Sequence, residues 1–204
     1  MRYLFLFFIP YLVYSSKPLI YIDPGHGGLD LGAVIKKPRM EEKRYTLITA
    51  HYTKRYLEKM GYRVSLTRSR DFFISLRRRV DIANRARAGI FLSIHYNSCP
   101  NKKASGIEIY CNKKINRCSY ISKLLAKNIL NSLTSRTKAK SRGIRRANYF
   151  VLKATKMPAV LIESGFLTNP SERNLIRQRE YLQKIARGIS EGVDKFVKSR
   201  NSKK

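Results

Sequence analysis

The chain has 204 residues, of which 43 are Lys or Arg and 13 are Asp or Glu, giving a formal net charge of +30. This length suits one domain with a sizeable core, and we expect no separate second module, since no internal repeat or Pro/Ser-rich linker divides the sequence. The charge predicts attraction to polyanions, and composition alone cannot choose between nucleic acid and anionic components of a cell envelope. None of the usual nucleic-acid-binding motifs is present, so we expect no specific nucleic-acid partner.

Residues 1–15 have the pattern of a secretory signal peptide. Arg2 precedes an apolar run from Tyr3 to Tyr14, which ends in small residues, and we expect cleavage after Ser15. The run contains Pro10 and is short for a membrane-spanning helix, although an uncleaved N-terminal anchor is the alternative. Both interpretations place the chain outside the cytoplasm, in the periplasm or cell envelope.

The rest of the chain alternates short apolar runs with longer amphipathic stretches. Residues 19–23, for example, form a β-branched run that stops at a Pro-Gly turn, which is typical of a buried strand. We expect strands at 19–23, 62–67, 90–95, 106–110, 148–152 and 159–163, and helices at 41–60, 75–88, 119–133 and 180–197. This order predicts a single α/β domain over residues 16–198, with a central, mostly parallel twisted sheet flanked by helices on both faces. Residues 199–204 form a basic tail that we expect to be disordered.

The three cysteines, Cys99, Cys111 and Cys118, show no zinc-binding spacing such as C-x-x-C. Cys111 and Cys118 are close enough in sequence to form a disulfide in an oxidising compartment. Three free thiols are the other interpretation, and the sequence leaves the choice open.

Two of the three histidines lie where expected strands end. His26 is in the Gly-rich loop 23–28, where glycines permit unusual backbone dihedrals, and His95 ends the third expected strand. Ligands collect beyond the carboxyl ends of parallel strands, and hydrolytic zinc sites use three nitrogen or carboxylate ligands plus a water. The pattern therefore predicts a zinc site completed by Glu41 or Glu42. Hydrogen-bonded structural histidines are the alternative.

Glu163 directly follows the apolar run 159–162. A carboxylate at such a place is costly unless it is paired or functional, and beside zinc it could take a proton from the attacking water. A carboxylate that caps the following turn is the alternative. The third histidine, His51, falls within an expected helix, and we assign it a surface or core position.

Several short motifs follow one another along the chain. They are Ile-Asp-Pro-Gly-His-Gly-Gly at 22–28, Glu-Lys at 42–43, Ser-Ile-His-Tyr-Asn at 93–97, Ser-Gly-Ile-Glu-Ile-Tyr at 105–110, Arg-Gly at 142–143, Tyr-Phe-Val-Leu at 149–152 and Met-Pro-Ala-Val-Leu-Ile-Glu-Ser-Gly-Phe-Leu-Thr-Asn at 157–169. In this order they resemble the zinc-dependent N-acetylmuramoyl-L-alanine amidases of the cell-separation type. The resemblance covers residues 19–193.

The resemblance implies a single α/β domain in which His26, Glu42 and His95 hold one Zn²⁺, with Glu42 chosen over Glu41. It implies that Glu163 acts as general base and acid. The reaction that the resemblance implies is hydrolysis of the amide bond between N-acetylmuramic acid and the L-alanine of the peptidoglycan stem peptide. We expect a monomer that binds peptidoglycan. A non-catalytic peptidoglycan-binding protein on the same scaffold is the alternative, expected if one of these residues were missing.

Two further expectations concern access to the zinc. Some members of the resembled family carry a long helical insertion that blocks the metal, but here only a short loop separates Tyr110 from the next expected helix, so we expect an open site. Residues 138–146 are rich in Lys and Arg and precede an expected strand. They either hold an acidic stem peptide or anionic glycan near the zinc, or form a solvated basic loop.

Overall fold

The short apolar runs assemble into a central sheet in the computed structural model, which describes residues 17–113 and 117–202. Within these residues one six-stranded sheet has the spatial order β4-β1-β5-β8-β6-β7. The strands are β1 (Ile20–Pro24), β4 (Val64–Leu66), β5 (Ile90–Asn97), β6 (Ile107–Asn112), β7 (Ser141–Ala147) and β8 (Ala159–Phe166). Among the described pairs of this sheet only β6–β8 is antiparallel, which confirms the mostly parallel sheet.

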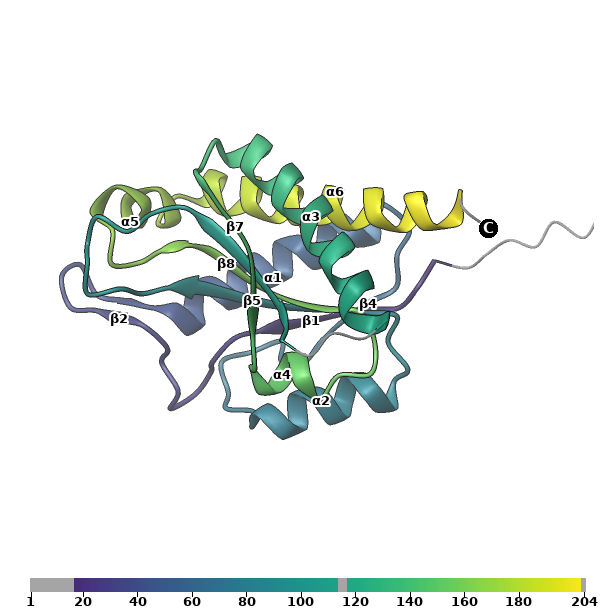
Figure 1. The fold of residues 1–204 in the computed structure, drawn as a ribbon. Helices are drawn as coiled ribbons and strands as arrows, with labels where there is room; N and C mark the ends of the chain where they lie inside the picture. The colour runs from purple at the N-terminus through teal and green to yellow at the C-terminus, as the bar shows by residue number, and fades with distance from the viewer. Residues whose placement is uncertain (1–16, 114–116, 203–204) are drawn as a thin grey trace, which may run out of the picture.

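Helices cover both faces of this sheet, as expected (Figure 1). One face carries α1 (Glu42–Lys59), α3 (Arg117–Thr137) and α6 (Arg179–Asn201), and the other carries the shorter α2 (Leu76–Arg85) and α4 (Phe150–Lys153). Helix α5 (Pro170–Ile176) follows β8, and a small antiparallel ribbon of β2 (Val34–Ile35) and β3 (Met40–Glu41) precedes α1.

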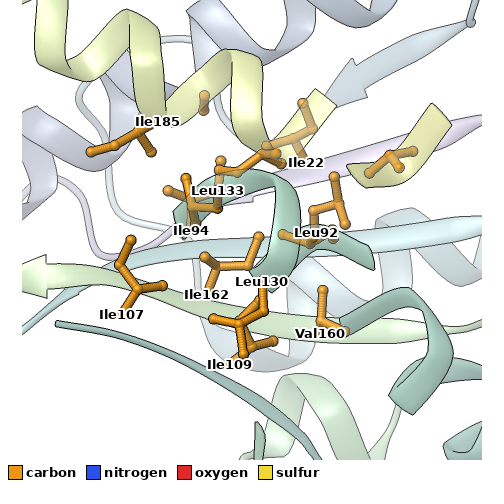
Figure 2. Close-up of a cluster of buried hydrophobic side chains, with 14 of the residues drawn as sticks. Ile22, Leu92, Ile94, Ile107, Ile109, Leu130, Leu133, Val160, Ile162 and Ile185 are labelled. Atoms are coloured by element: carbon orange, nitrogen blue, oxygen red, sulfur yellow. The ribbon is translucent and has the colours of Figure 1, made fainter. Parts of the chain in front are cut away.

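Alternation along the strands divides the apolar side chains between two cores of unequal size. The larger core lies against α1, α3 and α6 and includes Ile22, Leu92, Ile94, Val160 and Ile162 (Figure 2). The smaller core lies against α2 and α4, where Phe91, Ala159 and Leu161 pack on Val80, Ala83, Val151 and Leu152. Beside these two short helices a cleft opens at the carboxyl ends of the strands, lined by Asp23, His95 and Glu163 among others.

One expected strand is wrong, and one observed strand was not expected. Residues 148–152 were expected as a strand, but α4 begins at Phe150. Burial of Val151 and Leu152 against α2 overrides the β propensity of Phe-Val-Leu. The basic segment 138–146, for which no strand was expected, contains the edge strand β7, paired in parallel with β6. Charged side chains are common on edge strands, where they oppose pairing with other chains.

The C-terminal part also differs from the expectation. Helix α6 continues to Asn201, so residues 199–201, expected within a disordered tail, are helical. Helix α5 was not expected, although Asn169 caps it by accepting bonds from the backbone N–H groups of Ser171 and Glu172, and Pro170 begins it. That Asn-Pro start is a recognisable helix signal.

Two observations concern the segments outside the sheet. None of the helices in the described part of the chain is long and apolar enough to cross a membrane, and the expected signal peptide at 1–15 lies outside that part. Only residues 113–116 separate β6 from α3, so a long helical insertion does not fit between them.

Helices α3 and α6 pack with their backbones in close approach at Gly188 and Gly192. A Cβ on Gly188 would lie 2.6 Å from the Cα of Leu133, which is closer than real Cβ atoms come to other heavy atoms. The absence of a side chain at this position therefore sets the distance between the two helices.

We expect Gly188→Ala to destabilise the protein. Alanine gains about 1 kcal/mol of helix propensity, but overpacking against a backbone that cannot move aside costs about 1–3 kcal/mol. Urea denaturation followed by circular dichroism measures the balance. Lys184→Ala, at an exposed position of the same helix, is the control and should change little. A Gly188→Ala protein more stable than the wild type would contradict the packing argument.

Candidate metal centre

A buried ion pair fixes the loop that carries His26. Asp23, at the end of β1, is 1 % exposed and accepts hydrogen bonds from Arg79 Nη1 at 2.8 Å, Thr67 Oγ1 at 2.6 Å and Ser93 Oγ at 2.9 Å. The guanidinium of Arg79 also donates to the carbonyl oxygens of Pro24, His26 and Ile74. All of these groups are paired, as burial of a charge requires.

A second buried arginine ties the same loop to the start of α1. Arg68 donates to the carbonyl oxygens of Gly25 at 2.8 Å and Lys43 at 2.9 Å, and to Thr46 Oγ1. Burial, together with the nearby charge of Arg79, lowers the pKa of Arg68 to about 10. The cations beneath the loop thus replace the water that its carbonyls would otherwise bind.

The three residues predicted as zinc ligands come together at this loop. His26 Nε2 lies 3.1 Å from Glu42 Oε2, and His95 Nδ1 lies 3.0 Å from Glu42 Oε1. One ligand atom from each residue can be chosen so that all lie within 4.8 Å of one another, and this is the one such group found in the described chain. A Cβ on Gly32 would lie 2.6 Å from both the Glu42 carboxylate and the His26 ring, so the site needs glycine there.

Glu42 is held in place by the backbone as well as by the histidines. Its carboxylate accepts from the backbone N–H of Ala33 at 2.9 Å and of Tyr96 at 3.0 Å. Burial raises the pKa of Glu42, but the bonds from His26 and His95 outweigh burial and hold the pKa well below its usual range. Burial lowers the pKa of each histidine and Glu42 raises it more, so metal binding must displace protons from this group.

The donor set fits a zinc ion. His26 Nδ1 lies 2.8 Å from Asp30 Oδ1, which fixes the ring so that Nε2 faces Glu42. A carboxylate on the far nitrogen of a ligating histidine is the usual support of zinc sites. Two imidazoles and one carboxylate are the ligand set of catalytic zinc, which keeps a further position open. A cleft of about 440 Å³ lies against these three residues.

Glu163 lines the same cleft. It is the register partner of His95 on the neighbouring strand β5, so their side chains leave the sheet on the same face. Its Oε2 is buried and has no hydrogen-bond partner among the described residues. Burial raises the pKa of Glu163 to about 7, and the positive histidines do not offset it. A buried acceptor without a partner, next to the candidate ligands, has room for a water.

Comparison with known proteins assigns the chain to a family. The family model described as N-acetylmuramoyl-L-alanine amidase matches residues 20–195. The chain belongs to the N-acetylmuramoyl-L-alanine amidase family. A solved member, the amidase of Clostridium difficile 630, is 37% identical, with a TM-score of 0.87 over 91% of this chain and 100% of that chain.

Curated relatives agree with this family. The probable cell wall amidase LytH of Staphylococcus epidermidis is 35% identical over 190 residues, which cover 91% of this chain and 62% of LytH. The N-acetylmuramoyl-L-alanine amidase AmiA of Escherichia coli is 32% identical over 220 residues, covering 88% of this chain and 76% of AmiA. The chain thus spans less than two thirds of the length of LytH.

Glu108 was not expected as a functional residue. This buried carboxylate lies opposite Glu163 in the antiparallel β6–β8 pair and accepts from Asn97 Nδ2 at 2.6 Å. Arg142 and Arg145 pair with it at 3.1 and 2.7 Å, and these hydrogen-bonded cations hold its pKa below the usual range against the effect of burial. The argument used for Glu163, a carboxylate within an apolar strand, would have found it at Ile-Glu-Ile.

Glu108 also changes the interpretation of the basic segment. Arg142 and Arg145 belong to that segment, and both side chains are engaged with this carboxylate rather than simply solvated. Glu41, the other candidate ligand, pairs with Arg39 at 2.8 Å and is not part of the metal group.

The remaining candidate residues lie away from the cleft. His51 is exposed and its Nε2 lies 3.1 Å from the carbonyl oxygen of Ser69, as expected for a surface position. Cys99 and Cys111 are free, and burial raises the pKa of the Cys111 thiol to about 11. The side chain of Cys118 lies outside the described residues.

We expect Arg79→Ala to destabilise the fold strongly, because it leaves Asp23 buried without its cation. Breaking a buried ion pair costs about 3–5 kcal/mol. Chemical denaturation measures the free energy of unfolding, and the neighbouring Arg78→Ala, at an exposed position of α2, is the matched control. Equal stability of the two variants would show that the Asp23–Arg79 pair does not support the loop.

Proposed function

We propose that this chain is an exported, zinc-dependent N-acetylmuramoyl-L-alanine amidase that hydrolyses the bond between muramic acid and the stem peptide of peptidoglycan. The observation that carries the proposal is the joint placement of His26, Glu42, His95 and Glu163 around one cleft in a member of the amidase family. A non-catalytic peptidoglycan-binding protein on this scaffold would be expected to lack one of these four residues.

In this proposal His26, Glu42 and His95 hold the zinc. Zinc bound there supplies Lewis acidity, which polarises the scissile carbonyl and lowers the pKa of a water. Asp30 and the backbone N–H groups of Ala33 and Tyr96 keep the ligands oriented. The ligands therefore need little rearrangement before the reaction, which favours catalysis.

Glu163 is the proposed general base and acid. Its Oε2 has no competing partner among the described residues, and its pKa of about 7 suits both acceptance and release of a proton near neutral pH. Oε2 takes the proton of the attacking water. The same oxygen then returns that proton to the departing nitrogen of L-alanine.

Export and location are part of the proposal. The signal-like residues 1–15 and relatives named as cell wall amidases support export, and the location that we propose is the periplasm or cell envelope. The short connection at 113–116 supports a cleft that is not blocked by a helical insertion. We propose that the enzyme acts as a monomer.

The decisive test is incubation of the purified protein and of Glu163→Gln with peptidoglycan, followed by mass analysis. Wild type should release intact stem peptides, lose this activity on chelation and regain it with zinc. Glu163→Gln should keep its zinc and lose about 10²–10⁴-fold in rate, the contribution typical of general acid–base catalysis. Zinc-loaded wild type that releases no stem peptide from peptidoglycan would refute the proposed function.

Glu42→Gln tests the ligand set, with Glu41→Gln as the matched control one residue away. Loss of a direct ligand should lower zinc affinity by more than the roughly 10–100-fold typical of changes in outer-shell partners. Competition with a zinc-binding dye gives both affinities. Because Glu41 pairs with Arg39 outside the group, Glu41→Gln should bind zinc like wild type. Equal losses in both variants would remove Glu42 from the proposed site.

We also propose that the positive charge associates with anionic components of the envelope. Two adjoining hollows beside α1 and α6 are lined by cations and tyrosines without an acidic residue, and include Arg44, Arg55, Lys59, Arg177, Arg179 and Arg187. Arg179 Nε donates to Tyr52 Oη at 2.7 Å, and the guanidinium of Arg187 lies 5.1 Å from the centre of the Tyr56 ring. The tyrosines thus hold both arginine side chains in place on this basic surface.

Combined substitution of Arg55, Lys59 and Arg187 by glutamine should weaken retention on purified sacculi at low salt. The difference should vanish at high salt, because mobile ions screen exposed charges. The control removes the same charge from α2 by substituting Arg77, Arg78 and Arg85 with glutamine. Equal losses in both variants would show that net charge, rather than this surface, is responsible.

A further inference from the structure

One wall of the cleft is apolar and exposed. Phe73, Leu76, Tyr149 and Phe150 line it, with exposed fractions of 59, 57, 41 and 42 %. Three of the four residues are aromatic, and we call the four together the aromatic wall. In a chain with a net charge of +30, a gathering of large apolar side chains at the surface is unusual. Exposed apolar patches of this kind mark binding surfaces.

The segment that carries Phe73 is fixed by hydrogen bonds of the nearby Asp71. Asp71 accepts from the backbone N–H of Gly28 at 2.8 Å and from Lys43 Nζ at 2.7 Å. The loop of His26 and the Phe73 segment are in close approach, since a Cβ on Gly28 would lie 2.6 Å from the Phe73 amide nitrogen. The exposed ring is therefore positioned by the same loop that carries the candidate ligand His26.

Tyr149 and Phe150 are also positioned by buried neighbours. Val151 and Leu152, the next residues of α4, are buried in the smaller core, which orients the start of this helix toward the cleft. The Tyr149 ring meets the Tyr110 ring edge-on at 5.2 Å, and Tyr110 Oη donates to Glu108. Both sides of the aromatic wall are thus anchored to the network around the metal centre.

The rest of the cleft lining includes polar groups. Asp30, Asn97 and Ser98 line the cleft together with Glu163 and the candidate ligands. A ligand that crosses the candidate metal centre would therefore meet both apolar side chains and hydrogen-bonding groups.

The substrate of the proposed function has two chemically different halves. The glycan half consists of N-acetylated pyranose rings, which present C–H faces and acetyl methyl groups that pack well on aromatic rings. The peptide half carries amides and carboxylates that need hydrogen-bond partners. We propose that the aromatic wall is the subsite for the N-acetylated sugar rings of the glycan, and that the polar lining residues Asn97 and Ser98 contact the stem peptide. This inference rests on the proposed function and adds the orientation of the substrate.

The first test measures binding without turnover, by titrating the zinc-loaded protein with the tetramer of N-acetylglucosamine in a calorimeter. Phe73→Ala and Phe150→Ala should each weaken binding about 5–10-fold, the typical value of one aromatic contact. Phe72→Ala is the matched control, because Phe72 is 46 % exposed but lines a different hollow beside α2. All three variants should melt like wild type, since they change exposed side chains.

The second test compares cleavage of glycan strands with cleavage of a single muramoyl peptide. Phe73→Ala and Phe150→Ala should raise KM for the strands several-fold, leave kcat and zinc content unchanged, and affect the single muramoyl peptide less. No tetramer binding by wild type, or equal binding by wild type and the wall variants, would overturn the glycan subsite. If either result is found while wild type still releases stem peptides, the glycan subsite is wrong and the proposed function stands. If the tetramer binds through the wall but wild type releases no peptide, the subsite stands and the proposed function is wrong.

Discussion

The geometry of the candidate metal centre depends on the buried ion pair between Asp23 and Arg79. Asp23 lies next to the last residue of β1 and reaches Ser93 on β5 and Thr67 after β4, while Arg79 comes from α2 and binds the His26 carbonyl. One pair of charges therefore joins three strands, a helix and the loop of a candidate ligand. Such a pair contributes little net stability over apolar packing, but it costs much to break, which gives the loop a single well-defined position.

Side chains alternate along the strands, so the residues of the larger core and the residues of the candidate site lie on opposite faces of the sheet. Ile22, Leu92, Ile94 and Ile162 fill the larger core, and their sequence neighbours Asp23, Ser93, His95 and Glu163 project from the other face. On that face α2 and α4 bury Phe91 and Leu161, while His95 and Glu163 line a cleft. The reactive groups are thus held by a rigid sheet whose thicker side supplies the core and whose thinner side admits a ligand.

Much of this was predictable from local signals. The Gly-rich loop at 23–28 and the strand ends at His95 and Glu163 indicated one edge of a parallel sheet, and the structure places these residues around one cleft with Glu42. The pairing of Asp23 with Arg79 and of Glu108 with Arg142 was not predictable, because partners so distant in sequence are chosen by strand register and helix packing. Helix α4 was mistaken for a strand for the same reason: its contacts with α2 outweigh the local preference of Phe-Val-Leu.

The reversed direction of β6 has a consequence for variation among related enzymes. Because β6 runs against β8, the connection at 98–106 leaves β5 and enters β6 at the edge of the sheet that holds the cleft. Insertions in surface connections are tolerated more readily than changes in the strands they join. Insertions or changes of charge in this connection can therefore alter which ligands reach the cleft without disturbing the sheet beneath it.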